Sequence, residues 1–187
     1  MNRSGVRITI LCEDTQQAAF ARRFLEFYGV HRRELRSLVC PPGSEAASKW
    51  VVDTFPKELS EYRRRRNSQQ LALIIMIDAD SETAARRQAW LEQACGDAKV
   101  PGRAPDETVL YLVPRRNIET WFAFLRGEAV NEIDPYPRYD LESECQADAK
   151  RLDQVCRAGT LPGNTPESLR LACEEYVWLR KIIRRLP

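Results

Sequence analysis

The chain has 187 residues, of which 43% are hydrophobic and 30% are charged, and these proportions exclude a disordered chain. This length fits one domain, or one domain with a small appendage. The 29 Lys and Arg residues nearly balance 27 Asp and Glu residues, and a net charge of +2 excludes the bulk positive charge of a general nucleic-acid coat protein. The single histidine, His31, excludes metal sites that need several histidines within one chain. If the protein is an enzyme, carboxylates are therefore the expected chemical groups.

Neither the cysteines nor the apolar segments indicate a zinc site, a redox motif or a membrane anchor. No two cysteines are spaced as C-x-x-C, and we predict buried free thiols at Cys12, Cys40, Cys95, Cys145, Cys156 and Cys173. The N-terminus lacks the apolar core of a signal peptide, and no apolar stretch approaches the roughly 20 residues that cross a bilayer. We therefore expect a soluble, cytoplasmic protein that makes no contact with a membrane.

Four runs of apolar residues predict strands. The most apolar run, 71–77 (LALIIMI), does not alternate with polar residues, which indicates a strand covered on both faces, as in a parallel sheet. The runs at 6–12 (VRITILC) and 108–113 (TVLYLV) are also apolar, and 36–40 is a weaker candidate.

A helix is expected after each of these strands. The first covers 16–28, and the second begins at Ser44 as its N-cap and is kinked or restarted by Pro56. The third covers about 81–95, and Asn117 caps the fourth. Alternating strands and helices predict an α/β fold, with a parallel sheet of about four strands flanked by helices.

The last third of the chain has a different pattern, since it contains two apolar helical stripes and no strand. We expect a catalytic domain over 1–127 and a C-terminal pair of helices, within 128–187, that packs on it. In open parallel sheets, ligands bind beyond the carboxyl ends of the strands. Candidate site residues are therefore sought where the predicted strands end.

Acidic residues follow three of the predicted strands. Glu13 follows the first, Asp78, Asp80 and Glu82 follow the central one, and Glu119 lies in the first turn of the helix after the last. Asp78 and Asp80 are two residues apart and face the same way while the chain stays extended. Carboxylates crowded together repel one another and favour a hard cation such as Mg²⁺ or Mn²⁺. Such a cation activates water and stabilises the charge of phosphoryl transfer.

Each acid also has an ordinary structural explanation. An acid after a strand commonly caps the next helix, which applies equally to Glu13 and Asp78, and a first-turn glutamate such as Glu119 is ordinary helix electrostatics. Only the joint pattern on separate strands favours a metal site.

Two basic clusters lie near the predicted sheet. Arg115 and Arg116 follow the last strand, beside the acids, where they could hold a substrate phosphate or stabilise developing charge. The four arginines at 63–66 precede the central strand, and we interpret them as a solvated basic face, with phosphate binding as the alternative.

Three segments together resemble the TOPRIM domain of topoisomerases, bacterial primases and OLD-family nucleases. They are ILCEDT at 10–15, IIMIDADSE at 74–82, and VPRRNIETW at 113–121, which is similar to a proline-then-glutamate stretch of small stand-alone members of the OLD group. The resemblance covers about 5–127. Many TOPRIM domains have glycine after the first acid, whereas this chain has Asp14, a side chain that could crowd the turn or add a ligand.

The resemblance implies a Mg²⁺-dependent (or Mn²⁺-dependent) nuclease that hydrolyses phosphodiester bonds in DNA or RNA. Glu13 would be a ligand or general base, Asp78 and Asp80 would be catalytic metal ligands, and Glu82 and Glu119 complete the candidate metal set. Small members of the group are often encoded beside an ATPase and act in defence against phage. This chain has no Walker A loop, so any ATP dependence requires a partner ATPase. The choice between DNA and RNA, and the oligomeric state, stay open.

Three other functions are consistent with parts of the pattern. A non-catalytic TOPRIM-like module would bind nucleic acid or protein without cleaving it. A receiver-like signalling domain needs a lysine after a later strand, where this chain has Pro114 and Arg115. A phosphatase with an aspartate nucleophile usually carries D-x-D after its first strand, whereas here that motif follows a later strand.

Overall fold

The predicted α/β fold is confirmed by a computed structural model, which describes residues 5–44 and 46–183. Four parallel strands form one sheet in the order β2-β1-β3-β4. They are β1 (Arg7–Cys12), β2 (Leu35–Val39), β3 (Leu71–Met76) and β4 (Val109–Leu112). The central strands β1 and β3 pair over six residues, from Arg7 with Leu71 to Cys12 with Met76.

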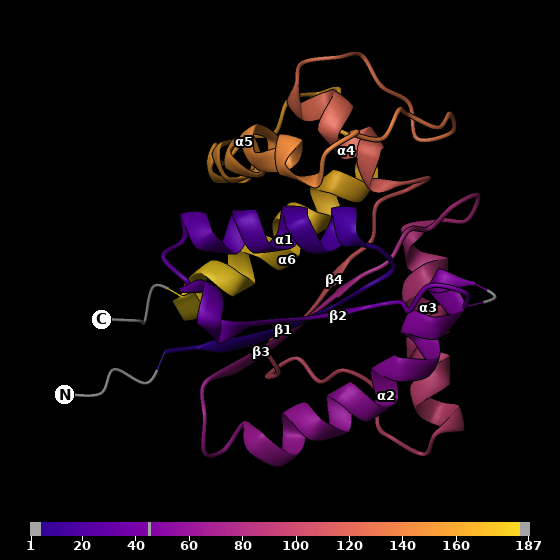
Figure 1. The fold of residues 1–187 in the computed structure, drawn as a ribbon, viewed down its shortest axis with the longest axis vertical. Coiled ribbons are helices and arrows are strands. Elements are labelled where there is room, and N and C mark those ends of the chain that lie inside the picture. The colour runs from indigo at the N-terminus through magenta and orange to yellow at the C-terminus, as the bar shows by residue number, and fades with distance from the viewer. Residues whose placement is uncertain (1–4, 45, 184–187) are drawn as a thin grey trace.

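Helices cover both faces of this sheet, as Figure 1 shows. One face packs against α1 (Thr15–Phe27) and α6 (Glu167–Ile183), and the other packs against α2 (Ala47–Arg65) and α3 (Ala84–Asp97). The remaining helices are α4 (Ile118–Leu125), α5 (Gln146–Arg157) and the short 3₁₀ turns η1 (Arg32–Glu34) and η2 (Glu142–Cys145).

The apolar runs of the sequence form strands because their residues are buried on both sides of the sheet. Alternate residues of β3 enter different core clusters: Ile74 faces the α1 side, whereas Leu73 and Ile75 face the α2 side, and all three are almost fully buried. This double burial explains why 71–77 shows no polar alternation.

The second helix differs from the prediction at both Ser44 and Pro56. Its N-cap is Ala46, whereas the Ser44 hydroxyl donates to the carbonyl of Pro41 in the preceding turn. The helix also runs through Pro56 as one element. Proline removes a backbone donor, but Phe55 and Leu59 beside it are completely buried against the sheet, and such packing can outweigh the roughly 3 kcal/mol that an internal proline costs.

The prediction of free thiols is wrong for two of the cysteines. Cys156 of α5 and Cys173 of α6 form a disulfide, with their Cα atoms 5.0 Å apart. The apolar stripes of the two helices pack against one another and so bring these side chains together. Of the four free thiols, Cys12, Cys95 and Cys145 are buried and Cys40 is partly exposed.

Residues from the C-terminal helices share a core with the sheet. Leu152 of α5 and Leu169 of α6 lie in the same apolar cluster as Ile8 and Phe20. The division at residue 127 stays a prediction. Within the described ranges, no helix combines the length and the apolar character needed to traverse a bilayer.

Candidate active site at the carboxyl edge of the sheet

The strand order places a switch in chain direction between β1 and β3. The chain leaves β1 toward β2 on one side and then returns to β3 on the other side, so the two crossovers diverge at the carboxyl ends of β1 and β3. Such switch points are where open parallel sheets form ligand sites. Glu13 directly follows β1, and Asp78 lies two residues beyond β3. The two predicted acids therefore meet at the point where this fold favours a site.

Glu13 and Asp78 are in direct contact. The backbone N–H of Asp78 donates to the Glu13 Oε1 atom at 2.6 Å. This bond fixes the Glu13 carboxylate against the end of β3. The structure thus confirms that the two acids lie together, although the bond itself does not establish a metal-binding role.

Gln17, which the sequence analysis did not single out, connects these two acids. Its side-chain oxygen accepts from the Glu13 N–H at 3.0 Å, and its side-chain nitrogen donates to Asp78 Oδ1 at 2.9 Å. Gln17 is completely buried. A glutamine on the buried face of the first helical turn was the sequence signal that could have identified it.

Asp14 performs the capping role that the sequence analysis had considered for Glu13. Its Oδ1 atom accepts from the backbone N–H of Gln17 at 2.8 Å, so Asp14 is the N-cap of α1. Its other oxygen forms an ion pair with Arg138. Glu13 is therefore free of capping, and its carboxylate faces the strand ends.

Arg138 is a second residue that the sequence analysis missed, and it lies between two acids of the site. Its Nη2 atom pairs with Asp14, and its Nε atom lies 3.2 Å from Glu119 Oε1. Arg138 and Glu119 form an ion pair but no hydrogen bond, since Glu119 Oε1 has no hydrogen-bond partner among the described residues. Glu119 itself is only 3% exposed. The arginine thus supplies positive charge to a buried carboxylate.

The segment that carries Arg138 is held in place at both ends. Glu132 accepts from the backbone N–H groups of Glu167 and Ser168, at the start of α6. At the other end, the Tyr139 ring stacks on Phe122 with centroids 5.2 Å apart. We call residues 131–139 the strap, because these contacts fix Arg138 over the acids.

Burial and neighbouring charge raise the pKa of three acids at this edge. Burial raises the pKa of Glu13 to about 7, although the Asp78 N–H opposes the shift. The pKa of Asp78 is raised well above its usual range, first by burial and then by the charges of Glu13, Asp14 and Glu119. Burial also raises the pKa of Glu119. Carboxylates in this situation retain protons or attract a cation.

Asp80 and Glu82 each form an ion pair with an arginine of α3. Asp80 adopts a left-handed backbone conformation with a φ of 55°, so the chain is no longer extended and the expectation that it faces the same way as Asp78 loses its basis. Its carboxylate lies 3.0 Å from the buried guanidinium of Arg87. Glu82 is exposed and pairs with Arg86. Their roles as metal ligands stay predictions.

Arg115 and Arg116 lie in the connection between β4 and α4. Arg116 also has a left-handed φ, 69°, and its backbone forms an isolated bridge with Asp80. Two non-glycine residues in this conformation side by side indicate local strain, which is often found at functional sites. Within the described part of the chain, neither guanidinium has a hydrogen-bond or ion-pair partner. Both are therefore available to an anion.

The acids at this edge are ligands of the type that a hard cation prefers, but they are not already arranged around a metal position. Glu13, Asp78, Asp14 and Glu119 offer carboxylate oxygens, which Mg²⁺ and Mn²⁺ prefer. Yet across residues 5–44 and 46–183 no three His, Cys, Asp or Glu side chains are grouped so as to hold a metal ion. Arg138 and Arg87 already pair with Asp14, Glu119 and Asp80. A metal would bind first where no arginine competes, at Glu13 and Asp78.

Of the arginines at 63–66, Arg64 is exposed to solvent as the sequence predicted, whereas Arg63 is largely covered. Arg63 makes two hydrogen bonds, of 2.6 and 2.8 Å, to Glu107, a carboxylate that is almost fully buried. Arg64 pairs with Glu61. Arg65 and Arg66 also lie within ion-pair distance of acids.

The chain matches no protein-family model, no curated protein and no solved structure.

Proposed function

We propose that the protein is a Mg²⁺-dependent nuclease of the TOPRIM type, which hydrolyses phosphodiester bonds in DNA or RNA. The observation that carries the proposal is the contact between Glu13 and Asp78 at the switch point. Near the same edge lie two arginines whose guanidinium groups have no partner among the residues that the structure describes. The resemblance of 10–15, 74–82 and 113–121 to TOPRIM segments supports it.

The residues of the chain have separate tasks in this reaction. Glu13 and Asp78 would hold the cation, which supplies charge neutralisation and an activated water when bound. The raised pKa of Glu13, about 7, suits it to accept a proton near neutral pH. Arg115 and Arg116 would hold a substrate phosphate, because their guanidinium groups pair with no other described residue and lie at the turn that follows β4. Gln17 keeps the two acids in register.

A non-catalytic binding module is the second candidate, and the arginines favour it. Arg138 and Arg87 neutralise Asp14, Glu119 and Asp80 without any metal. In a domain that no longer binds a cation, arginines in these positions would supply the positive charge that the acids need. Metal binding separates the two candidates, because the module would bind no divalent ion at this edge.

The proposal is tested by incubating the protein with single- and double-stranded DNA and RNA in Mg²⁺, Mn²⁺ or EDTA. Cleavage with either ion, abolished by EDTA, is expected. Because the resemblance extends to proteins encoded beside ATPases and active against phage, the assay is repeated with the product of a neighbouring ATPase gene and ATP. Metal-independent cleavage, or no cleavage under any of these conditions, would reject the nuclease and leave the binding module.

A further inference from the structure

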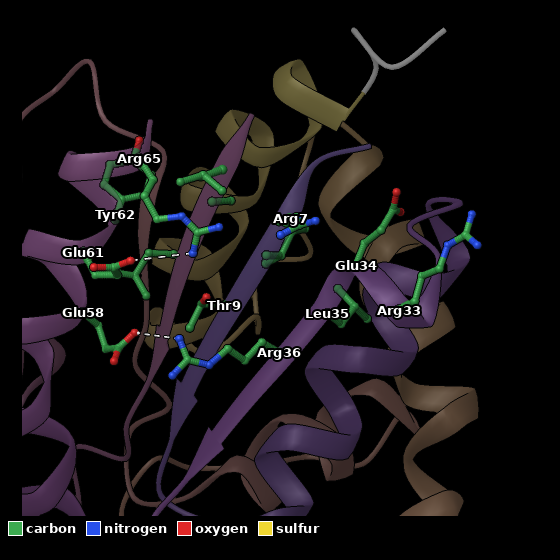
Figure 2. Close-up of a pocket in the computed structure, with 14 residues that line it drawn as sticks. Arg7, Thr9, Arg33, Glu34, Leu35, Arg36, Glu58, Glu61, Tyr62 and Arg65 are labelled. Carbon is green, nitrogen blue, oxygen red and sulfur yellow. Dashed lines mark hydrogen bonds and ion pairs between the residues drawn. The ribbon is translucent and has the colours of Figure 1, made fainter. Parts of the chain in front are cut away.

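A pocket lies at the amino-terminal edge of the sheet, opposite the edge that carries Glu13 and Asp78. It has a volume of about 330 Å³ and lies between α2 and the exposed face of β1 and β2. Its charged lining consists of four arginines and three glutamates, from β1 (Arg7), η1 (Arg33, Glu34), β2 (Arg36) and α2 (Glu58, Glu61, Arg65), and Thr9 and Tyr62 add hydroxyl groups. Figure 2 shows Arg36 and Arg65 reaching toward the hollow in which Arg7 and Thr9 lie.

The sheet register brings these polar groups together on one face. Thr9 pairs with Arg36 on the neighbouring strand, and Arg7 lies two residues before Thr9, so all three point to the α2 side. Neighbouring strands are roughly 4.8 Å apart. The faces of a parallel sheet are ordinarily apolar, so two arginines and a threonine here are unusual for a core surface.

Positive charge in this pocket is not fully matched by acids. Arg36 forms an ion pair with Glu58 at 3.4 Å. Arg65 lies 3.7 Å from Glu61, which makes its closer contacts to Arg64, and donates one hydrogen bond to the neutral side chain of Gln69 at 2.9 Å.

Two side chains of the pocket also have hydrogen-bond donors that no described protein group accepts. Among the residues that the structure describes, the Arg7 guanidinium and the Thr9 hydroxyl have no hydrogen-bond or ion-pair partner. Arg7, Arg36, Arg65 and Thr9 therefore leave donors unused in a pocket whose arginines outnumber its glutamates, and such donors suit an anion.

We propose that this pocket binds a phosphate-bearing ligand of nucleotide size, with the phosphate held by Arg7, Thr9, Arg36 and Arg65. Its volume lies at the lower end of the range for small-molecule sites. Apolar side chains beside the charges, Leu35, Leu71 and Leu73, suit the sugar or ring portion of such a molecule. The inference goes beyond the proposed nuclease, because the pocket lies at the edge of the sheet opposite Glu13 and Asp78.

The test is a calorimetric titration at low salt with 5′-AMP, with adenosine, and with a short DNA strand carrying a 5′ phosphate. We expect 5′-AMP or the phosphorylated strand to bind and adenosine not to bind. Arg7→Gln and Thr9→Val should each weaken binding, by about tenfold for Arg7, because each variant removes a hydrogen bond to a charged phosphate. Binding of 5′-AMP would assign a free nucleotide, and binding of the strand alone would assign a nucleic-acid end.

Two control variants locate the binding. Arg64→Gln removes an exposed arginine that shares Glu61 but does not line the pocket, and Arg86→Gln removes an exposed arginine in the first turn of α3 that also does not line it. Both should bind as wild type does, and melting temperatures verify that every variant is folded. The inference is overturned if neither phosphate ligand binds, if adenosine binds equally well, or if Arg7→Gln binds the phosphate ligands as tightly as wild type does.

Discussion

The backbone N–H of Asp78 donates to the carboxylate of Glu13 across the boundary between β3 and β1, at 2.6 Å. This bond joins two acids that are 65 residues apart in the chain, at the point where the strand order reverses. It leaves the Asp78 carboxylate oriented by Gln17 and brings two negative charges together. The chemistry we propose depends on this pair.

Replacing Glu13 by Gln should abolish cleavage while preserving some metal binding. The amide oxygen can still accept from Asp78 N–H and bind a cation, but the amide cannot take a proton at neutral pH. Cleavage rates and Mn²⁺ affinity are measured together, with Asp97→Asn, an exposed acid on α3, as the control. Wild-type turnover in Glu13→Gln would remove Glu13 from the mechanism.

Stability without metal should fall as the pH rises from about 4.5 to about 7. The pKa of Glu13 is raised to about 7 in the folded state, so the folded protein binds more protons than the unfolded chain across this interval. The decrease in stability due to Glu13 is on the order of 3 kcal/mol. Urea unfolding in EDTA measures it, and in Glu13→Gln the decrease should be smaller by that amount. An identical pH profile in the variant would contradict the raised pKa.

Replacing Arg138 by Gln should raise the affinity for Mn²⁺ by about threefold or more, because the variant removes a cation that competes for Asp14 and Glu119. Hydrogen exchange in the strap should quicken in the same variant. Arg86→Gln, which removes an exposed partner of Glu82, is the control and should change neither quantity. If Arg138 only stabilises the fold, the variant will melt at a lower temperature with its Mn²⁺ affinity unchanged.

Changing Arg115 and Arg116 together to Ala should weaken nucleic-acid binding and flatten its salt dependence. For each phosphate that the variant no longer binds, the slope of log affinity against log salt concentration should fall by roughly 0.7 to 0.9, regardless of base sequence. Arg64→Ala is the suitable control, because Arg64 is highly exposed and pairs with Glu61 on its own helix. An unchanged slope in the double variant would move the binding surface away from the acidic edge.

Arg63 is expected to stabilise the fold through its hydrogen bonds to Glu107. Its removal leaves the carboxylate of Glu107, which is 4% exposed, without its main partner. We expect Arg63→Ala to lower the free energy of unfolding by about 2 kcal/mol, given the partial exposure of the arginine. Chemical denaturation of this variant beside Arg64→Ala measures the difference, and equal stability would contradict the structural role.

The sequence predicted the parts of the structure that depend on local pattern. The unbroken apolar run at 71–77 predicted a strand buried on both faces, and acids at two strand ends predicted that Glu13 and Asp78 would meet. Both follow from the parallel sheet, since it places the carboxyl ends of its strands together.

Other features depend on contacts between distant segments, which no local pattern contains. Arg138 reaches Asp14 only because the strap is anchored on Phe122 and on the start of α6. The disulfide needs α5 and α6 to pack together at one particular register. Asp80 was predicted to face the same way as Asp78 because the chain was expected to stay extended. The left-handed backbone conformation of Asp80 ends that extended segment.

The central claim, that Glu13 and Asp78 hold a hard cation, is tested most directly by titrating Mn²⁺ into the wild-type protein and Asp78→Asn. Free Mn²⁺ is followed by electron paramagnetic resonance, with Asp97→Asn as the control. The account predicts saturable binding to wild type and to the control, and an affinity at least about tenfold lower in Asp78→Asn, which corresponds to roughly 1.4 kcal/mol of binding free energy. Equal Mn²⁺ affinity in all three proteins, or no binding by any of them, would contradict it.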